Sequence, residues 1–584
     1  MTPEPRQRRV AAILTVGLAL LLAALAGFLV YIYAASSDVL AARASRQQHM
    51  RIPIQPMRGN IVDARLRVLA GSQAIRSVFA DPKVVEDVAE AATRVAPVLG
   101  LDRDEVYRTL AEASDRRFVW LKRRVPTETA DAIHRLKLRG VSLATEGVRH
   151  YPNGSLAAHL LGFVGVDEQG LEGLERLFDA RLRGRPGKAC VLADCRRRPI
   201  WMEPGDFTPA RDGQHLVLTI DAVIQAAAER AIAEAVRKYR AVSATAIVMD
   251  PRTGAIWAMA NVPTYDPARY GEFSADARRN RAVTDMFPPG SSGKPFTAAA
   301  AVEAGVVRFG EVIYCENGYW PAANLHDAGH AYGNLMFEQG IQKSSNIMMG
   351  KIGMRLGNRR LHDALVAFGF GRKTGVWLSG EVPGLVFPLA RWTRLSTTRV
   401  PFGQEYMVTP LQLITAFAAF ANGGRIMRPK ILRGVLDNRG RVAVDLSEPQ
   451  VVGRAMSEKT ARDMLDRALV GVIESGTGKR CRIPGYRVFG KTGTAQKIDP
   501  DTKRISHTLY VGAFLAGVPA ENPRMVVLVL VNEPDKSLGY YGGTVAAPAA
   551  KQILQQTLTY LGIPPSEPVS GRRETYLAGQ TVRH

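Results

Sequence analysis

The chain has 584 residues, and its 77 lysines and arginines against 54 aspartates and glutamates leave a formal net charge of +23. This length allows several domains, and a composition with 46% hydrophobic and 22% charged residues excludes a chain that is disordered throughout. The excess charge is compatible with an anionic neighbour, such as acidic lipid headgroups or a polyanionic wall, or with a solvated arginine-rich surface. The basic residues are scattered and form no stripe interleaved with aromatic residues, so no nucleic acid partner is predicted.

A membrane anchor is predicted at the N-terminus. No charged residue occurs from Val10 to Ser37, and this apolar run is long enough to cross a bilayer as a helix. Arg6, Arg8 and Arg9 precede it, which predicts a cytoplasmic N-terminus and the rest of the chain on the extracytoplasmic, periplasmic side. A cleaved signal peptide is the alternative. The run exceeds the usual length of a signal's apolar region, which favours an uncleaved, single-pass anchor in the inner membrane.

Turn-rich breaks divide the remaining chain. Glycine and proline cluster at residues 184–187 and 203–206, and the last residues are polar and proline-rich. The predicted segments are a tail and anchor at 1–37, a mixed α/β pedestal domain at 38–212, a catalytic domain at 213–562 and a mobile tail at 563–584.

Four cysteines do not make a disulfide scaffold in so long a chain, and buried free thiols are the favoured interpretation. Cys190 and Cys195 are close enough in sequence to pair across a tight hairpin, and an extracytoplasmic location would permit this. No CxxC spacing suggests zinc.

The segment from residue 213 onward has the pattern of a layered α/β core. Asp221 is a suitable N-cap for a helix that runs to about Tyr239. Continuous apolar runs predict strands buried on both faces at 243–250, 255–260, 508–518 and 524–532, and a closing helix is expected at 546–561. A sheet with helices before, between and after it means helices packed on a central sheet.

Residues 291–294 (SSGK) place a serine hydroxyl one helical turn from a lysine amine. The alanine-rich run that follows is a strong helix former, so Ser291 is predicted at a helix N-terminus, where the dipole favours developing negative charge. Lys294 acts as a base only when neutral, and lowering its pKa from about 10.4 to about 7 requires roughly 4–5 kcal/mol. Burial and a second cation, for which Lys491 is the candidate, can supply this. Taken alone, the motif is common by chance and is better explained as an N-cap beside a surface lysine.

Residues 344–346 (SSN) precede another predicted helix. The hydroxyl of Ser344 could relay a proton to a leaving amine, and the amide of Asn346 could hold both the base and a substrate amide. A plain helix N-cap is the alternative.

Residues 491–494 (KTGT) follow an apolar stretch and are interpreted as the end of a strand. Thr492 and Thr494 would project to one side and bind a carboxylate, while Gly493 lets a peptide lie close against the strand. The backbone N–H groups of Thr494 and Ser291 could form an oxyanion hole. A turn is the alternative.

No cofactor and no metal are predicted. The chain contains no glycine-rich phosphate loop of the Walker or Rossmann type. His326 and His330 are four residues apart, but Gly329 makes a helix doubtful there and no third ligand is evident.

Together, the three motifs in this order resemble those of the class B penicillin-binding proteins, and the resemblance extends from the anchor to about residue 562. Further segments fit the same family, and several are more similar to its cell-division (FtsI-like) branch than to its elongation branch. These segments are residues 58–61, 149–152, 170–175, 280–282, 380–384, 403–413 and 540–543. One departure is Gly293, where the family usually carries a larger residue.

The resemblance implies an α/β (α+β) penicillin-binding transpeptidase fold, with a central, mainly antiparallel sheet flanked by helices. It implies that Ser291 is the acylated nucleophile and Lys294 its base, with Ser344, Asn346 and Lys491 as further catalytic residues. Thr492, Gly493 and Thr494 would bind substrate. The implied reaction is D,D-transpeptidation of peptidoglycan stem peptides during septal wall synthesis. The implied partners are a lipid-linked precursor, a membrane-embedded SEDS-type glycan polymerase and division proteins, with β-lactams as inhibitors.

Other functions remain open at this stage. An elongation-type transpeptidase, a D,D-carboxypeptidase or a β-lactamase could carry the same motifs, although a hydrolase needs a positioned base that activates water. A non-catalytic β-lactam sensor or scaffold belongs to a different class, and the intact motifs argue against it.

Overall fold

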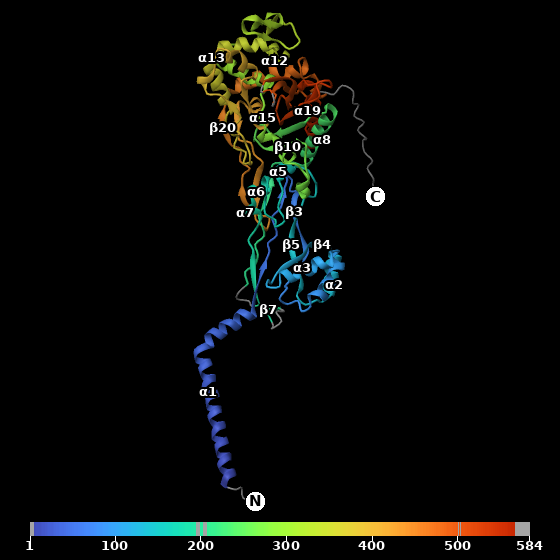
Figure 1. Ribbon diagram of the computed structural model, residues 1–584. Helices are drawn as coiled ribbons and strands as arrows, with labels where there is room; N and C mark the ends of the chain where they lie inside the picture. Colours follow the sequence, from blue (N-terminus) through green and yellow to red (C-terminus); the bar gives the residue numbers. More distant parts are fainter. Residues whose placement is uncertain (1–4, 194–198, 203–206, 500–501, 503, 567–584) are drawn as a thin grey trace, which may run out of the picture. The chain divides into compact units, whose positions relative to one another are not determined.

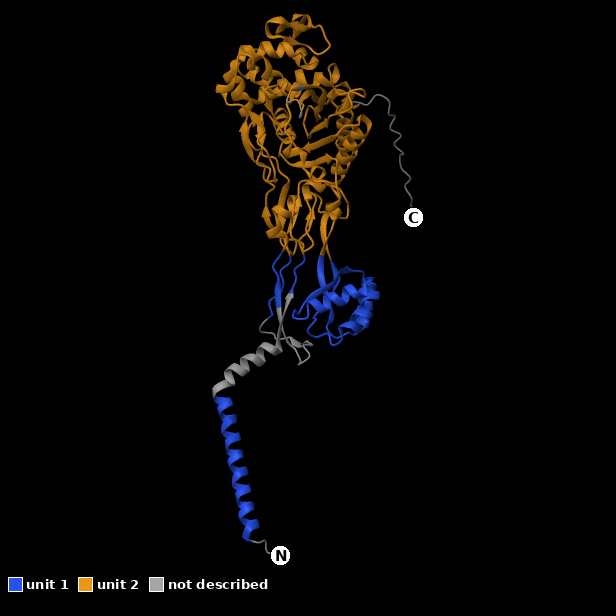
Figure 2. Cartoon of the chain, viewed as in Figure 1, with its two compact units in different colours: residues 1–57, 74–147, 184–212 blue, residues 58–73, 148–183, 213–584 orange. Residues whose placement is uncertain are grey.

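The structure is a computed structural model that describes residues 5–193, 199–202, 207–499, 502 and 504–566 (Figure 1). The chain forms two compact units (Figure 2). The first comprises residues 1–57, 74–147 and 184–212, and the second comprises residues 58–73, 148–183 and 213–584. Cys195 lies outside the described residues, so the hairpin disulfide stays a prediction, as do the four segment boundaries.

The N-terminal helix α1 (Pro5–Gln48) carries the predicted anchor. Its stretch Pro5–Ala34 is long and apolar enough to cross a membrane, and its most apolar window is not buried by any other part of the protein. Large aliphatic side chains exposed on all sides of a helix are stable in lipid rather than in water. The helix is therefore consistent with the predicted anchor.

The remainder of unit 1 is a mixture of short helices and strands. Strand β1 (His49–Ile54) pairs antiparallel with β6 (Gly187–Ala193), which pairs with β7 (Pro199–Met202). The other elements are α2 (Val88–Leu99), α3 (Arg103–Glu112), β4 (Val119–Val125), α4 (Thr127–Arg135) and most of β5 (Val141–His150). Asp87 and Asp102 cap α2 and α3 by accepting bonds from first-turn amides.

The residues of the predicted pedestal that fall in unit 2 are organised around one buried carboxylate. Glu175 is fully buried, and its carboxylate forms ion pairs with Arg58 at 2.7 Å and with Arg149 at 2.6 Å. Arg58 also contacts Asp179, at 2.7 Å. Because an unpaired buried charge is very costly, these ion pairs require residues 58, 149 and 175 to fold together. They lie near the short helices α5 (Ala158–Leu161), α6 (Gly173–Leu177) and α7 (Asp179–Leu182).

A five-stranded antiparallel sheet forms the centre of the catalytic part of unit 2. Its order is β10-β9-β23-β22-β21. The strands are β9 (Ser243–Met249), β10 (Ile256–Val262), β21 (Phe489–Ile498), β22 (Ile505–Val518) and β23 (Met525–Asn532). The predicted strands are confirmed, and so is the mainly antiparallel sheet that the family resemblance implied.

Both faces of this sheet are buried in separate hydrophobic cores. Along β23, Val527 and Val529 pack with α8 (Ala222–Tyr239) and α19 (Ala547–Leu561). The alternate residues Val526 and Leu528 face the core that contains α15 (Pro410–Ala418). A strand with two buried faces has a continuous apolar sequence, and this is the pattern that predicted it. Figure 1 shows α8 and α19 beside the sheet.

Three helices that pack in the core containing α15 begin or end at the motifs. Helix α11 (Lys294–Glu303) follows the short 3-10 turn η3 (Gly290–Gly293). Helices α12 (Phe337–Lys343) and α13 (Asn346–Ala367) meet at Ser344 and Ser345. Asp221 caps α8 by accepting from Val223 N and Ile224 N, as predicted.

Unit 2 contains further strands. They are β2 (Ile61–Val62), β8 (His215–Leu218), β18 (Leu432–Leu436) and β19 (Val442–Asp445), with the two-stranded pairs β11 (Val312–Tyr314) and β14 (Asn334–Met336), β12 (Tyr319–Trp320) and β13 (Leu325–His326), β15 (Leu385–Val386) and β16 (Tyr406–Met407), and β17 (Arg425–Met427) and β20 (Val451–Arg454). Strand β3 (Val68–Ala80) contributes residues to both units.

Candidate active site

The turn that carries Ser291 is a 3-10 turn, and the α-helix begins only at Lys294. The sequence predicts Ser291 at a helix N-terminus, and in the structure Ser291 lies in the 3-10 turn that leads directly into α11. Pro295 sits in the first helical turn and has no N–H, so the preceding turn closes through a bond from Lys294 N to Ser291 O. Ser292 Oγ is buried and donates to Pro289 O at 2.5 Å, whereas Ser291 is half-buried. Of the two adjacent serines, Ser291 is therefore the accessible one.

The amines of Lys294 and Lys491 converge on one hydroxyl group. Lys294 Nζ lies 3.1 Å from Ser344 Oγ and 2.5 Å from the Ser344 carbonyl oxygen. Lys491 Nζ lies 3.0 Å from the same Oγ and donates to Thr492 O at 3.1 Å. Both lysine side chains are fully buried. The structure thus brings together one residue from each of the three motifs, which are far apart in the sequence.

This arrangement lowers the pKa of both amines. Burial lowers the pKa of Lys294 to about 7, against the opposing effect of the Asp327 carboxylate. Burial, together with the charge on Lys294, holds the pKa of Lys491 well below its usual value. The sequence predicts burial and the charge of Lys491 as the two causes that lower the pKa of Lys294. In the structure burial is the main cause for both amines. Lys294 therefore has the balance of charged and neutral forms that a general base requires near neutral pH.

Ser344 is held in an unusual backbone conformation. Its φ of 65° and ψ of 40° are left-handed, and it ends α12, with its N–H donating to Ile341 O and Gly340 O nearby. A non-glycine residue in this region is strained, and such strain is typically tolerated where the surroundings hold the residue in place. Here the strained residue presents both its hydroxyl and its carbonyl oxygen to the two lysines.

Asp327 fixes the motif that contains Ser344, and sequence reasoning did not identify this role. Its buried carboxylate accepts from Ser345 Oγ at 2.8 Å and from the backbone N–H groups of Asn346 and Ile347 at 2.5 and 3.1 Å. Ser345 Oγ in turn caps α13 by accepting from Met348 N. A carboxylate at a helix N-terminus satisfies orphan amides and is favoured by the dipole. Asp327 lies 18 residues before Ser345 in the sequence, so no local pattern indicated this contact.

The histidines beside Asp327 do not converge on a common point. The His326 ring stacks on Tyr319 with centroids 4.3 Å apart, and the His330 ring stacks on Tyr332 at 5.1 Å. The amide of Asn346 donates to the His326 carbonyl oxygen at 2.9 Å. Within the described residues, this is the contact that the Asn346 amide makes, rather than one with Lys294. The described part of the chain holds no cluster of three potential metal ligands.

The second lysine and the two threonines lie near the start of β21, at the edge of the sheet. The sequence analysis took this motif for the end of a strand, which is wrong, because the ladder with β22 continues to Ile498. Thr492 Oγ1 lies 2.7 Å from Thr477 Oγ1, and Thr494 Oγ1 accepts from Gly542 N at 3.1 Å. Thr477 was not identified from the sequence. Its position between two glycines was the only signal.

Three glycines allow close contacts between this strand and the neighbouring segments. A Cβ atom on Gly493 would lie 3.0 Å from Ser292 Oγ, and one on Gly542 would lie 2.3 Å from Gly493 O. Gly290 has a φ of +54°, and a Cβ there would lie 2.7 Å from Thr494 O. The backbones beside Ser291 and at Thr494 are therefore in close contact, as a shared oxyanion hole requires.

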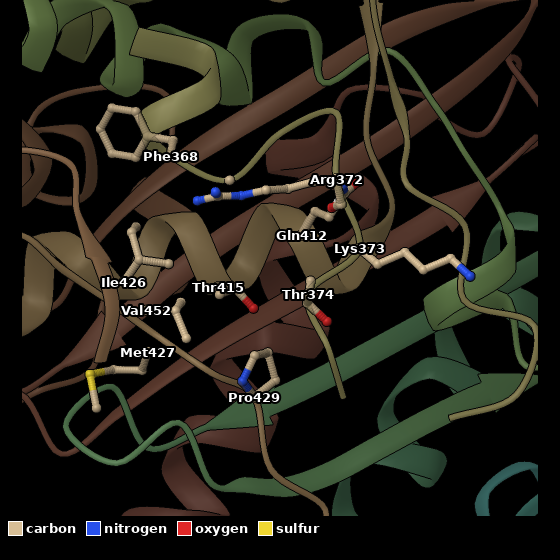
Figure 3. Close-up of a pocket in the computed structure, with 11 residues that line it drawn as sticks. Phe368, Arg372, Lys373, Thr374, Gln412, Thr415, Ile426, Met427, Pro429 and Val452 are labelled. Atoms are coloured by element: carbon tan, nitrogen blue, oxygen red, sulfur yellow. Dashed lines mark hydrogen bonds between the residues drawn. The ribbon is translucent and has the colours of Figure 1, made fainter. Parts of the chain in front are cut away.

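Buried free thiols are confirmed for Cys315 and Cys481. A small cavity elsewhere in unit 2 has a volume of about 30 Å³ and is lined by residues that include Phe368, Arg372, Thr374, Gln412 and Val452 (Figure 3). Gln412 spans it by donating to Arg372 O at 2.8 Å. A space of this size holds only one or two water molecules, so the cavity is not a substrate site.

Two known families match two different parts of the chain. The family described as penicillin binding protein transpeptidase domain matches residues 244–555, and the penicillin-binding protein dimerisation domain matches residues 53–218.

Full-length relatives are similar over nearly the whole chain. Stage V sporulation protein D of Bacillus subtilis is 34% identical over 92% of this chain and 83% of its own length. Peptidoglycan D,D-transpeptidase FtsI of Escherichia coli is 34% identical over 96% of this chain and 93% of its own length.

Solved structures agree. A peptidoglycan synthetase from Bifidobacterium adolescentis has a TM-score of 0.71 at 26% identity, covering 89% of this chain and 98% of that one. Penicillin binding protein 3 of Mycobacterium tuberculosis, complexed with aztreonam, has a TM-score of 0.69 at 27% identity, covering 89% and 99%.

Proposed function

The chain belongs to the class B penicillin-binding proteins, and we propose that Ser291 is the residue acylated in the peptidoglycan D,D-transpeptidase reaction of this family. It is a serine D,D-transpeptidase with an N-terminal dimerisation-type domain and an N-terminal apolar helix. The observation that carries the assignment is the meeting of Lys294 and Lys491 at the hydroxyl of Ser344, with Lys294 three residues after the accessible Ser291.

In the first half-reaction, Ser291 Oγ attacks the carbonyl carbon of the penultimate D-Ala, and its proton passes to neutral Lys294. The oxyanion forms against the N–H groups of Ser291 and Thr494. The peptide C–N bond then breaks, and Lys294 returns the proton through Ser344 Oγ to the nitrogen of the departing D-Ala. The product is an ester between Ser291 and the donor stem peptide.

In the second half-reaction, an amine of a neighbouring stem peptide attacks this ester. Its proton is taken up through the same lysine and hydroxyl, and the C–O bond to Ser291 breaks to restore the enzyme. The hydroxyls of Thr492 and Thr494 bind the substrate carboxylate, beside the charge of Lys491. A β-lactam opens its ring on Ser291 in the first half-reaction and remains attached, because no amine reaches it.

Mass spectrometry of the penicillin-treated protein tests the assignment. We expect one penicilloyl adduct on the peptide that contains Ser291, and none in Ser291→Ala. Ser292→Ala is the matched control, since Ser292 is buried and its hydroxyl is bonded to Pro289 O, and it should still be labelled. An adduct on Ser291→Ala, or on a peptide that lacks residue 291, would show that the nucleophile is wrongly assigned.

The finer role is also part of the proposal. Residues 380–384 and 403–413 resemble the cell-division branch, so we assign the protein to septal wall synthesis alongside a SEDS-type polymerase. Arg6, Arg8 and Arg9 before the apolar helix support a cytoplasmic N-terminus and an extracytoplasmic catalytic domain. Depletion should then produce filamentous cells, and a fluorescent fusion should gather at the septum. Rounded cells with lateral fluorescence would indicate elongation instead.

A further inference from the structure

Gly293, the third residue of the SSGK motif, has its side-chain space occupied by another residue. A Cβ atom built on Gly293 would lie 2.4 Å from Tyr406 Oη and 3.2 Å from the Cα atom of Gly403. Because real Cβ atoms do not approach other atoms so closely, even alanine would not fit without displacing the tyrosine. The phenol therefore occupies the volume that a side chain between Ser292 and Lys294 would fill.

Tyr406 is buried in a way that packing alone does not explain. The residue is 1% exposed, and its ring lies 5.8 Å from that of Phe370. Its hydroxyl has no hydrogen-bond partner in the part of the chain that the structure describes. A buried unpaired hydroxyl is destabilising, and a phenylalanine would fill the core without this cost. The hydroxyl group extends the side chain as far as Gly293, because its oxygen is the atom nearest to a Cβ built on that glycine.

Backbone hydrogen bonds join the segment around Tyr406 to the segment that carries Ser291 at two further points. Phe287 and Val408 exchange two backbone hydrogen bonds, each of 3.0 Å. Gly290 N donates to Gly403 O at 3.0 Å. Residues 287–294 therefore run along residues 403–408, and Tyr406 lies between the two hydrogen-bonded points.

We propose that Tyr406 is a positioning residue for the nucleophile, and that it supports the turn of Ser291 and Lys294 from below in place of a side chain at position 293. The ring and its hydroxyl prevent residues 290–293 from moving toward Phe370, and the absence of a side chain on Gly293 leaves the space that they occupy. Positions 293 and 406 form a coupled pair, in which a large residue at one requires a small residue at the other. The inference rests on the proposed role of Ser291, since the support matters only if this turn carries the reacting oxygen.

A double-mutant cycle on the full-length protein tests the coupling. The variants are Tyr406→Leu, Gly293→Val and the double variant. For each, acylation by a fluorescent penicillin is followed at rising concentration, to separate the rate constant at saturation from the apparent dissociation constant. We expect each single variant to lose at least tenfold in the rate constant with little change in the dissociation constant, because a misplaced nucleophile slows the reaction without weakening binding. The double variant should recover most of this loss.

Tyr265→Leu is the control, because Tyr265 is also fully buried but packs against His159 and Phe163. It should lower the melting temperature and leave the rate constant unchanged. If Gly293→Val does not fold, recovery of folding in the double variant supports the coupling, and Gly293→Ala with Tyr406→Phe supplies a milder cycle.

Independent, multiplicative effects in these cycles would overturn the inference, as would a loss confined to the dissociation constant. Either result could occur while wild-type protein is still labelled at Ser291, and the proposed function would then stand. Absence of labelling at Ser291 in the wild type would instead refute the proposed function.

Discussion

The pH dependence of acylation provides the most direct test of the lysine base. With the pKa of Lys294 at about 7, the neutral fraction is about half at pH 7 and about 1% at pH 5. The acylation rate constant should therefore rise about tenfold per pH unit below pH 7 and level off above it. A lysine with its usual pKa would instead give a rate that is still rising tenfold per unit at pH 9.

Asp327→Asn tests the cause of that midpoint. The carboxylate favours the charged form of Lys294, so removing its charge should move the midpoint to lower pH. The asparagine oxygen can still accept from Asn346 N and Ile347 N, which preserves the cap. The rising part of the profile of acylation rate constant against pH should shift to lower pH, while the plateau at high pH changes less.

The assay is stopped-flow acylation by a chromogenic cephalosporin between pH 5 and pH 9, with a stability check at each pH. Glu338→Gln is the control, since Glu338 bonds to Gly310 N and should leave the midpoint unchanged. A wild-type profile without an inflection in this range would refute the neutral-lysine argument. The same midpoint in wild type and Asp327→Asn would remove the carboxylate from it.

Three further outcomes are expected. Lys294→Met should lack acylation yet raise the free energy of unfolding at pH 7 by about 1–3 kcal/mol, because a buried amine whose pKa is depressed opposes folding. Wild-type stability should rise between pH 7 and about 10.5, where only the unfolded chain still binds this proton, and chemical denaturation should give a shallower rise in the variant. Ser344→Ala should slow acylation by about 100-fold or more with similar penicillin affinity, and an unchanged rate in stopped flow would exclude the relay. Glu175→Gln should lower the free energy of unfolding by about 3–5 kcal/mol, because it removes the buried charge that pairs with Arg149 and one of the two carboxylates that pair with Arg58. An unchanged denaturation midpoint would contradict this.

Local patterns were sufficient to predict most of the secondary structure. The apolar runs around Val248 and Val529 have no alternation because both faces of the sheet are covered, and Asp221 caps its helix through a bond two residues away. The errors concern boundaries. The sequence does not distinguish the 3-10 turn before Pro295 from an α-helical turn, because both have three- to four-residue spacing. The end of β21 was likewise misplaced, because its apolar signal is interrupted by polar residues that belong to the proposed site.

Residue chemistry and the order of three short motifs determined the class of reaction from the sequence alone, because a serine, two lysines and an amide at those spacings have few other uses together. Only the tertiary structure shows what each serine hydroxyl group contacts. Ser292 and Ser345 are bonded to Pro289 and Asp327, whereas Ser344 is turned toward both lysines by a left-handed backbone. The pKa of Lys294, the cap supplied by Asp327 and the tyrosine beneath Gly293 were also decided there. Each depends on burial and on contacts between segments distant in the chain, and no local pattern encodes these.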